Sequence, residues 1–82
     1  MLPPRSPIAA RDLLRKYGYL NSHDSGAGGK HKFEFSVVIN GLHYSVADYI
    51  NPDDQDSIDR FHIQAAAVLV KELDRLGIKR DS

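Results

Sequence analysis

The clearest pattern in the chain is an alternation of apolar and polar positions between residues 33 and 48. It is interrupted only by Asn40-Gly41, a pair that favours a two-residue type I′ turn. Such a turn fixes the register, and this register puts the apolar side chains of both strands on one face. The sequence therefore predicts an antiparallel hairpin with one apolar and one solvated face. The expected pairs are Phe35 with Val46, Val37 with Tyr44, and Ile39 with Leu42.

The last third of the chain has a helical period. Ser57 is predicted to cap a long helix that runs to about Leu76 and ends at Gly77. Its main apolar arc consists of Ile58, Phe61, Ala65, Val68, Leu69, Leu73 and Leu76. His62 is expected to be a partly exposed residue of this helix.

A second apolar stripe, formed by Ile63, Ala67 and Val70, extends this arc towards the opposite side of the helix. The helix should therefore pack against more than one surface. Either the first helix covers the stripe, or a partner protein does. Ile63, Ala67 and Val70 are accordingly candidates for a protein interface.

The first half of the chain has weaker signals. A short helix is predicted over residues 8–17, with Ser6 as its cap, Pro7 at its first position and Gly18 at its end. Residues 21–32 are predicted to form a glycine-rich, locally basic loop, so the first strand should be short or missing. The expected organisation is a flexible lead-in at 1–7, one domain at 8–77 and a tail at 78–82.

The amino-acid composition limits the classes of function that the chain can have. The chain has 82 residues, enough for one domain, and no cysteine, which favours an intracellular setting in cytoplasm, nucleus or an organelle. Lys plus Arg and Asp plus Glu both number 11, so any phosphate-binding surface must be local. The longest apolar run, residues 65–70, is too short to span a membrane. No catalytic, metal-binding or phosphate-loop spacing is present, so we expect no enzyme activity, cofactor, metal or small-molecule substrate.

Three segments in this order resemble the double-stranded-RNA-binding domain. Leu13-Leu14 followed by Tyr17-Gly18 is similar to the end of that family's first helix, and Phe33, eight residues before Gly41, to its central strand. The second helix is matched by Ser57, Ala65-Ala66, Leu69, Val70 and Leu73. The resemblance covers residues 8–76. It implies an α+β fold of order α-β-β-β-α, with two helices on one face of a small antiparallel sheet.

The resemblance also implies an RNA surface made of the first helix, the loop before the central strand and lysines at the start of the second helix. This chain departs from it at the lysines, whose segment reads Ser57-Ile58-Asp59-Arg60-Phe61-His62. An acidic loop with Asp53, Asp54 and Asp56 precedes that segment. The remaining candidates for RNA contact are Arg15, Lys16, Lys30, His31, Lys32 and Arg60.

These features predict a non-catalytic binding module that mediates protein–protein interaction or self-association. Its contact with RNA is expected to be weakened or lost. The alternative is genuine, shape-specific binding of double-stranded RNA. A third hypothesis is an unrelated domain with the same topology. RNA binding predicts a basic stripe with the acidic loop turned away from it. Protein interaction predicts Ile63 and Val70 on an exposed patch, or a dimer in solution.

Overall fold

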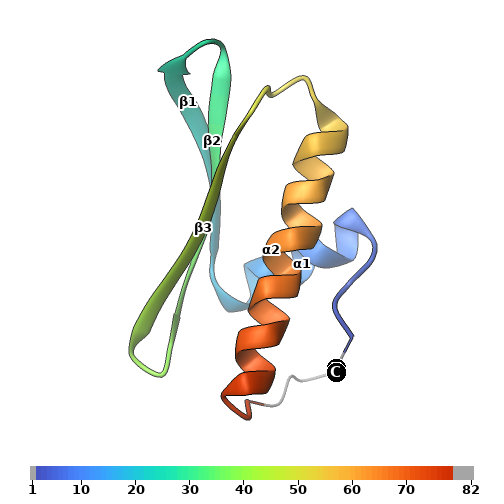
Figure 1. The fold of residues 1–82 in the computed structure, drawn as a ribbon, viewed down its shortest axis with the longest axis vertical. Helices are drawn as coiled ribbons and strands as arrows, with labels where there is room; N and C mark the ends of the chain where they lie inside the picture. The colour runs from blue at the N-terminus through green and yellow to red at the C-terminus, as the bar shows by residue number, and fades with distance from the viewer. Residues whose placement is uncertain (1, 79–82) are drawn as a thin grey trace.

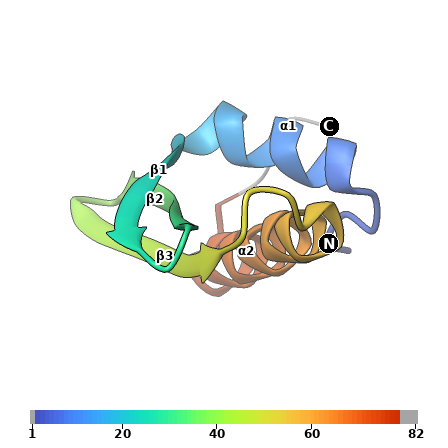
Figure 2. The ribbon, with the colours of Figure 1, turned by 90° about the horizontal axis from the view of Figure 1, so that it is seen from above.

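The chain folds as a helix, three strands and a helix (Figure 1). The computed structural model describes residues 2–78, so Met1 of the predicted lead-in and residues 79–82 of the predicted tail lie outside it. The elements are α1 (Pro7–Tyr17), β1 (Tyr19–Ala27), β2 (Lys30–Ile39), β3 (Leu42–Ile50) and α2 (Gln55–Arg75). The antiparallel sheet has the order β1-β2-β3, and both helices lie on one side of it (Figure 2). The predicted α+β fold is confirmed.

The β2–β3 hairpin has the predicted register. Phe35 pairs with Val46, Val37 with Tyr44 and Ile39 with Leu42. Asn40 and Gly41 have φ values of 51° and 80°, as a type I′ turn requires. The turn chemistry and the alternation both favour this register, which is why a local pattern was enough to find it.

The prediction of a loop over residues 21–32 is wrong, and so is that of a short or missing first strand. β1 spans nine residues, and Lys30, His31 and Lys32 belong to β2. Gly28 and Gly29, with φ values of 60° and 71°, make the turn between these strands. The register shifts between Asp24 and Ala27, where the Ser25 hydroxyl donates to the carbonyl of Lys30. β1 is an edge strand held by its pairing with β2, so it needs no apolar alternation of its own.

Both helices have polar caps. The Ser6 hydroxyl accepts the Ala9 N–H at 3.2 Å, as predicted for α1. The cap predicted for α2 is corrected: Asp54 caps it, and the helix begins at Gln55. The Asp54 carboxylate accepts both the N–H of Ser57, at 3.2 Å, and its hydroxyl, at 2.7 Å. An aspartate satisfies the free N–H groups of a first turn as well as a serine does.

The core lies between the apolar face of the sheet and the two helices. Its main cluster joins α1 and α2 to the middle of β2, with Leu14 and Leu73 as the largest fully buried side chains. A smaller cluster at the other end of the sheet consists of Phe33, Ile50, Ile58 and Phe61. The helices also pack against each other, and Val70 is only 3% exposed. The second apolar stripe of α2, formed by Ile63, Ala67 and Val70, is therefore partly buried within the domain.

Candidate functional site

The basic residues predicted to bind RNA are spread over several surfaces. Arg15 and Lys16 are in the last turn of α1, and the other candidates lie on β2 or α2. Lys32 forms an ion pair with Glu34, at 3.9 Å between Nζ and Oε2. Alternation along β2 puts both on the face opposite Phe33 and Phe35, away from the helices. The same alternation puts His31, which is half-buried, on the helix side.

Lys30 and Arg60 both line a hollow of about 240 Å³ between the end of β3 and the first turns of α2. Asp48 and Asp54 line the same hollow. The hydrogen bonds from the Ser57 hydroxyl and N–H, and also the charge of Arg60, hold the pKa of Asp54 below its ordinary value. The acidic loop thus faces the two cations, contrary to the arrangement that RNA binding predicts.

The three protein-interface candidates do not form an exposed patch. Val70 is buried, and Ile63 and Ala67 are half-buried. The exposed apolar residue of this part of α2 is Val68, at 48% exposure. The sequence pattern assigned Val68 to the core arc, because helical spacing defines a face but not how far the neighbouring strand covers it.

Val68 lies in what we call the β3–α2 groove, a mainly apolar furrow between β3 and α2 that Asp48 and Gln64 also line. It contains two adjoining hollows, one of about 200 Å³ and one of about 20 Å³. Val46, Ala65 and Val68 line both of them. β3 is an edge strand, so this furrow runs along an unpaired strand edge.

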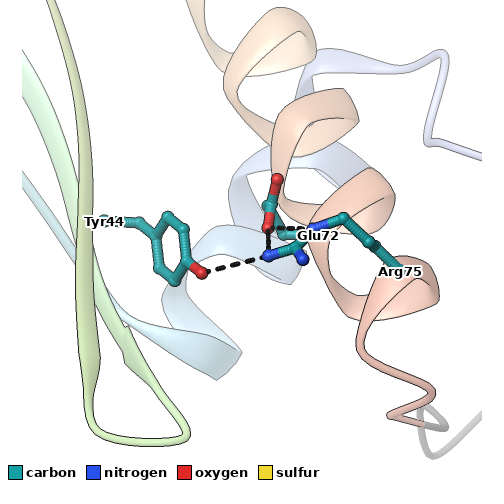
Figure 3. A network of polar contacts seen from close by, with 3 residues as sticks. All are labelled: Tyr44, Glu72 and Arg75. Carbon is teal, nitrogen blue, oxygen red and sulfur yellow. Dashed lines mark hydrogen bonds and ion pairs between the residues drawn. The ribbon is translucent and has the colours of Figure 1, made fainter.

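A polar network of Tyr44, Glu72 and Arg75 borders the groove (Figure 3). The Arg75 guanidinium donates to Glu72 Oε2 at 2.7 Å and 3.0 Å, and to the Tyr44 hydroxyl at 3.3 Å. The hydrogen bond and charge of Glu72 raise the pKa of Arg75. Tyr44 and Glu72 both line the groove, so the network joins the last turn of α2 to β3 at its margin.

His62 contradicts the expectation of a partly exposed residue. It is 5% exposed, its ring packs edge-on against Phe61 with centroids 5.8 Å apart, and its Nδ1 has no hydrogen-bond partner among the described residues. Burial lowers the pKa of His62, the nearby charges of Arg11 and Arg15 lower it further, and Asp59 opposes them. These surroundings therefore favour the neutral form of His62 over the protonated form.

We expect the free energy of unfolding to fall as the pH drops below about 6.5, the unfolded-state pKa of histidine. The unfolded chain then binds a proton that native His62 accepts only near its lowered pKa. The contribution of neutral His62 to the free energy of unfolding is complete above about pH 6.5. It is lost as the pH falls towards the pKa of His62 in the folded state, with a slope of up to about 1.4 kcal/mol per pH unit. Urea unfolding at several pH values measures it. A His62→Gln variant should lose this slope, and His43→Gln, at an exposed position, should keep it. An unchanged slope in His62→Gln would contradict the assignment.

Other kinds of site are not indicated. Within residues 2–78, no cluster of His, Asp or Glu side chains is arranged to hold a metal ion. In the same residues, neither helix has the length and apolar content that a membrane crossing requires.

Comparisons with family models, with curated proteins and with solved structures found no match to this chain.

Proposed function

We propose that this chain is a non-catalytic binding module that self-associates through the edge of β3 and the β3–α2 groove. The α-β-β-β-α order resembles that of a double-stranded-RNA-binding domain, and in this proposal RNA contact is weakened or lost. The observation that carries the proposal is the apolar groove beside an unprotected strand edge, lined by Val46, Ala65 and Val68.

The free edge of β3 follows from its turn. A two-residue turn is flanked by a hydrogen-bonded pair, here Ile39 and Leu42, so backbone groups of every second residue from His43 onward point away from β2. Near the end of the strand, the Asp48 carboxylate accepts the Tyr49 N–H at 2.9 Å. The part of the edge that can pair with another strand is therefore residues 43–47.

These five residues suit a second copy of the same chain. Natural edge strands are usually protected by charged side chains, proline or bulges, and His43-Tyr-Ser-Val-Ala47 has no Lys, Arg, Asp, Glu or Pro. Antiparallel pairing of two such edges is symmetric about Ser45, as a two-fold dimer requires. Tyr44 of one copy would then face Val46 of the other, on the side of the sheet that holds the groove. Val68 would be covered at the same time.

The start of α2 argues against RNA as the principal ligand. Of the positions where the resemblance implies lysines, Ile58 and His62 are 8% and 5% exposed, and Asp59 carries a negative charge. Side chains that pack in the core cannot reach a phosphate backbone. Lys30 and Arg60 remain nearby, but they share their hollow with Asp48 and Asp54. The counterion release that drives duplex binding would be correspondingly small.

Sedimentation velocity over a wide range of protein concentration tests the self-association. The native chain should shift from monomer to dimer, and Val68→Lys should weaken the dimer by about tenfold or more, because it puts a charge into an apolar contact. Val38→Lys is the matched control, since Val38 is 66% exposed on the other face of the sheet. A native chain that stays monomeric, or an equal effect of both variants, would contradict the proposal.

A titration with duplex RNA tests the alternative function, which is binding of double-stranded RNA. A duplex of about 20 base pairs is long enough, because a double-stranded-RNA-binding domain spans about 16 base pairs. We expect no strong binding even at low salt. Binding that weakens steeply with salt, and that a Lys30→Ala/Lys32→Ala double variant abolishes, would restore the RNA-binding hypothesis.

A further inference from the structure

A second polar hollow, of about 230 Å³, lies at the opposite edge of the sheet from the β3–α2 groove. It is an open hollow bordered by α1, by the start of β1, by Phe33 of β2 and by the first turns of α2. Its apolar wall consists of Leu20, Phe33 and Ile58. Its polar lining consists of Arg11, Arg15, Asn21, Ser22, Gln55 and His62. No acidic side chain lines it, although the chain as a whole has as many acids as bases.

The two arginines of this hollow are unneutralised. Arg11 and Arg15 are four residues apart, so they lie on one face of α1, where two like charges destabilise a helix. Within residues 2–78, neither guanidinium group has a hydrogen bond or an ion pair. Arg11 is half-buried, so its charge is less screened than that of a fully exposed side chain. An anion held between the two guanidinium groups would remove their repulsion.

His62 adds a titratable ring to the lining of this hollow. It lines the same hollow, the residue is only 5% exposed, and its Nδ1 has no hydrogen-bond partner among the described residues. Leaving a buried polar atom unpaired is costly in a domain with a thin core. The charged groups near the ring are Arg11 and Arg15 on α1, and Asp59 on α2, whose carboxylate accepts the Gln55 amide at 2.8 Å.

We propose that the hollow of Arg11, Arg15 and His62 binds the phosphate group of a small phosphomonoester. Arginine forks match the geometry of phosphate oxygens in paired hydrogen bonds, and the amides of Asn21 and Gln55 and the Ser22 hydroxyl supply further donors. A volume of about 230 Å³ is below that of typical sites for drug-sized ligands, so it fits a head group and a short attachment.

The surroundings favour a single phosphate over a polymer. Asp53, Asp54 and Asp56 lie at the start of α2, next to Gln55, and would repel the further phosphates of a nucleic acid. One phosphate between the two arginines avoids them. A bound dianion also favours the protonated form of His62, so binding should strengthen as the pH falls. The β3 edge takes no part in this site, so phosphate binding does not depend on self-association.

The test is a titration of the ¹⁵N-labelled full chain with inorganic phosphate at constant ionic strength, followed by amide chemical shifts. Saturable shifts are expected around residues 11–15, 20–22 and 55–62. An Arg11→Gln/Arg15→Gln variant should bind about tenfold or more weakly, because it loses the charged donors. The control is Lys30→Gln/Lys32→Gln, which changes the net charge equally but away from the hollow. Its affinity should stay native, and the spectra also show that both variants are folded.

Sulfate serves as a second probe, because it stays a dianion while phosphate itself titrates. Its affinity for the native chain should rise several-fold between about pH 7.5 and about pH 6, and His62→Gln should lose this rise. Shifts that do not saturate, or an equal loss of affinity in the lysine control, would overturn the site. A rise that persists in His62→Gln would overturn the role of His62.

Discussion

Replacing Leu14 by alanine should lower the free energy of unfolding by about 2–5 kcal/mol. Leu14 is 0% exposed on α1 and belongs to the main core cluster together with Ala10 and Leu73. Truncation removes buried methyl groups and leaves a cavity that the two packed helices can close only in part. A domain of 82 residues has a total stability of about 4–12 kcal/mol, so this loss is a large fraction of it.

Urea unfolding followed by circular dichroism measures the loss, and Ile8→Ala is the matched control. Ile8 is on the same helix but 65% exposed, so its truncation opens no cavity, and alanine is the better helix former. Its free energy of unfolding should change by no more than about 0.5 kcal/mol. Similar losses in the two variants would mean that α1 does not pack through Leu14 as described.

The parts of the fold that were predictable are those with local causes. The β2–β3 hairpin follows from the Asn40-Gly41 turn and the alternation beside it, and both are visible in a short window of sequence. β1 has no such signal: its residues are mostly polar, and only the pairing with β2 makes them a strand. The sequence also predicts the second helix, but it predicts Ser57 as the cap, because Asp54 stands in a run of acidic residues that is typical of a loop.

The candidate sites were less predictable, because they depend on which neighbour covers which face. Helical spacing put Val68 and Val70 on adjoining stripes, but it could not show that Val70 is buried in the domain while Val68 borders the open groove. His62 is similar. Its burial depends on how α1, with Arg11 and Arg15, lies against α2, and a long-range contact of this kind leaves no periodic trace in the sequence.

Gly18 ends α1 as predicted, but the reason why this position needs a glycine differs from the predicted one. The sequence suggested a helix stop, for which glycine usually adopts a positive φ, but Gly18 has a φ of −151°, which any residue can adopt. Glycine is required here because there is no space for a side chain. A Cβ at this position would lie 2.3 Å from the Ser36 carbonyl oxygen and 2.9 Å from two ring carbons of Phe35. The link from α1 to β1 therefore presses directly against the backbone of β2.

Gly18→Ala is expected to destabilise the domain by about 3 kcal/mol, at the upper end of the usual cost of overpacking. A rotamer change cannot relieve the clash, because one of the atoms met is a backbone oxygen in the central strand. The chain can escape only by separating α1 from the sheet or by shifting the pairing of Tyr19 with Ser36. Thermal and urea unfolding of the variant measure the cost, and amide exchange shows whether the loss extends into β2.

Gly28 is the matched control, because it has open space around it but a φ of 60°. Gly28→Ala should cost only the left-handed backbone strain, about 1–2 kcal/mol, and Gly28→Asn should cost less, since asparagine tolerates this conformation. At Gly18 the order reverses: the larger asparagine should be worse than alanine, because space and not φ is limiting. If asparagine were the better substitute at both positions, backbone conformation would be the cause at Gly18 as well, and the close contact with Phe35 and Ser36 would carry no energetic weight.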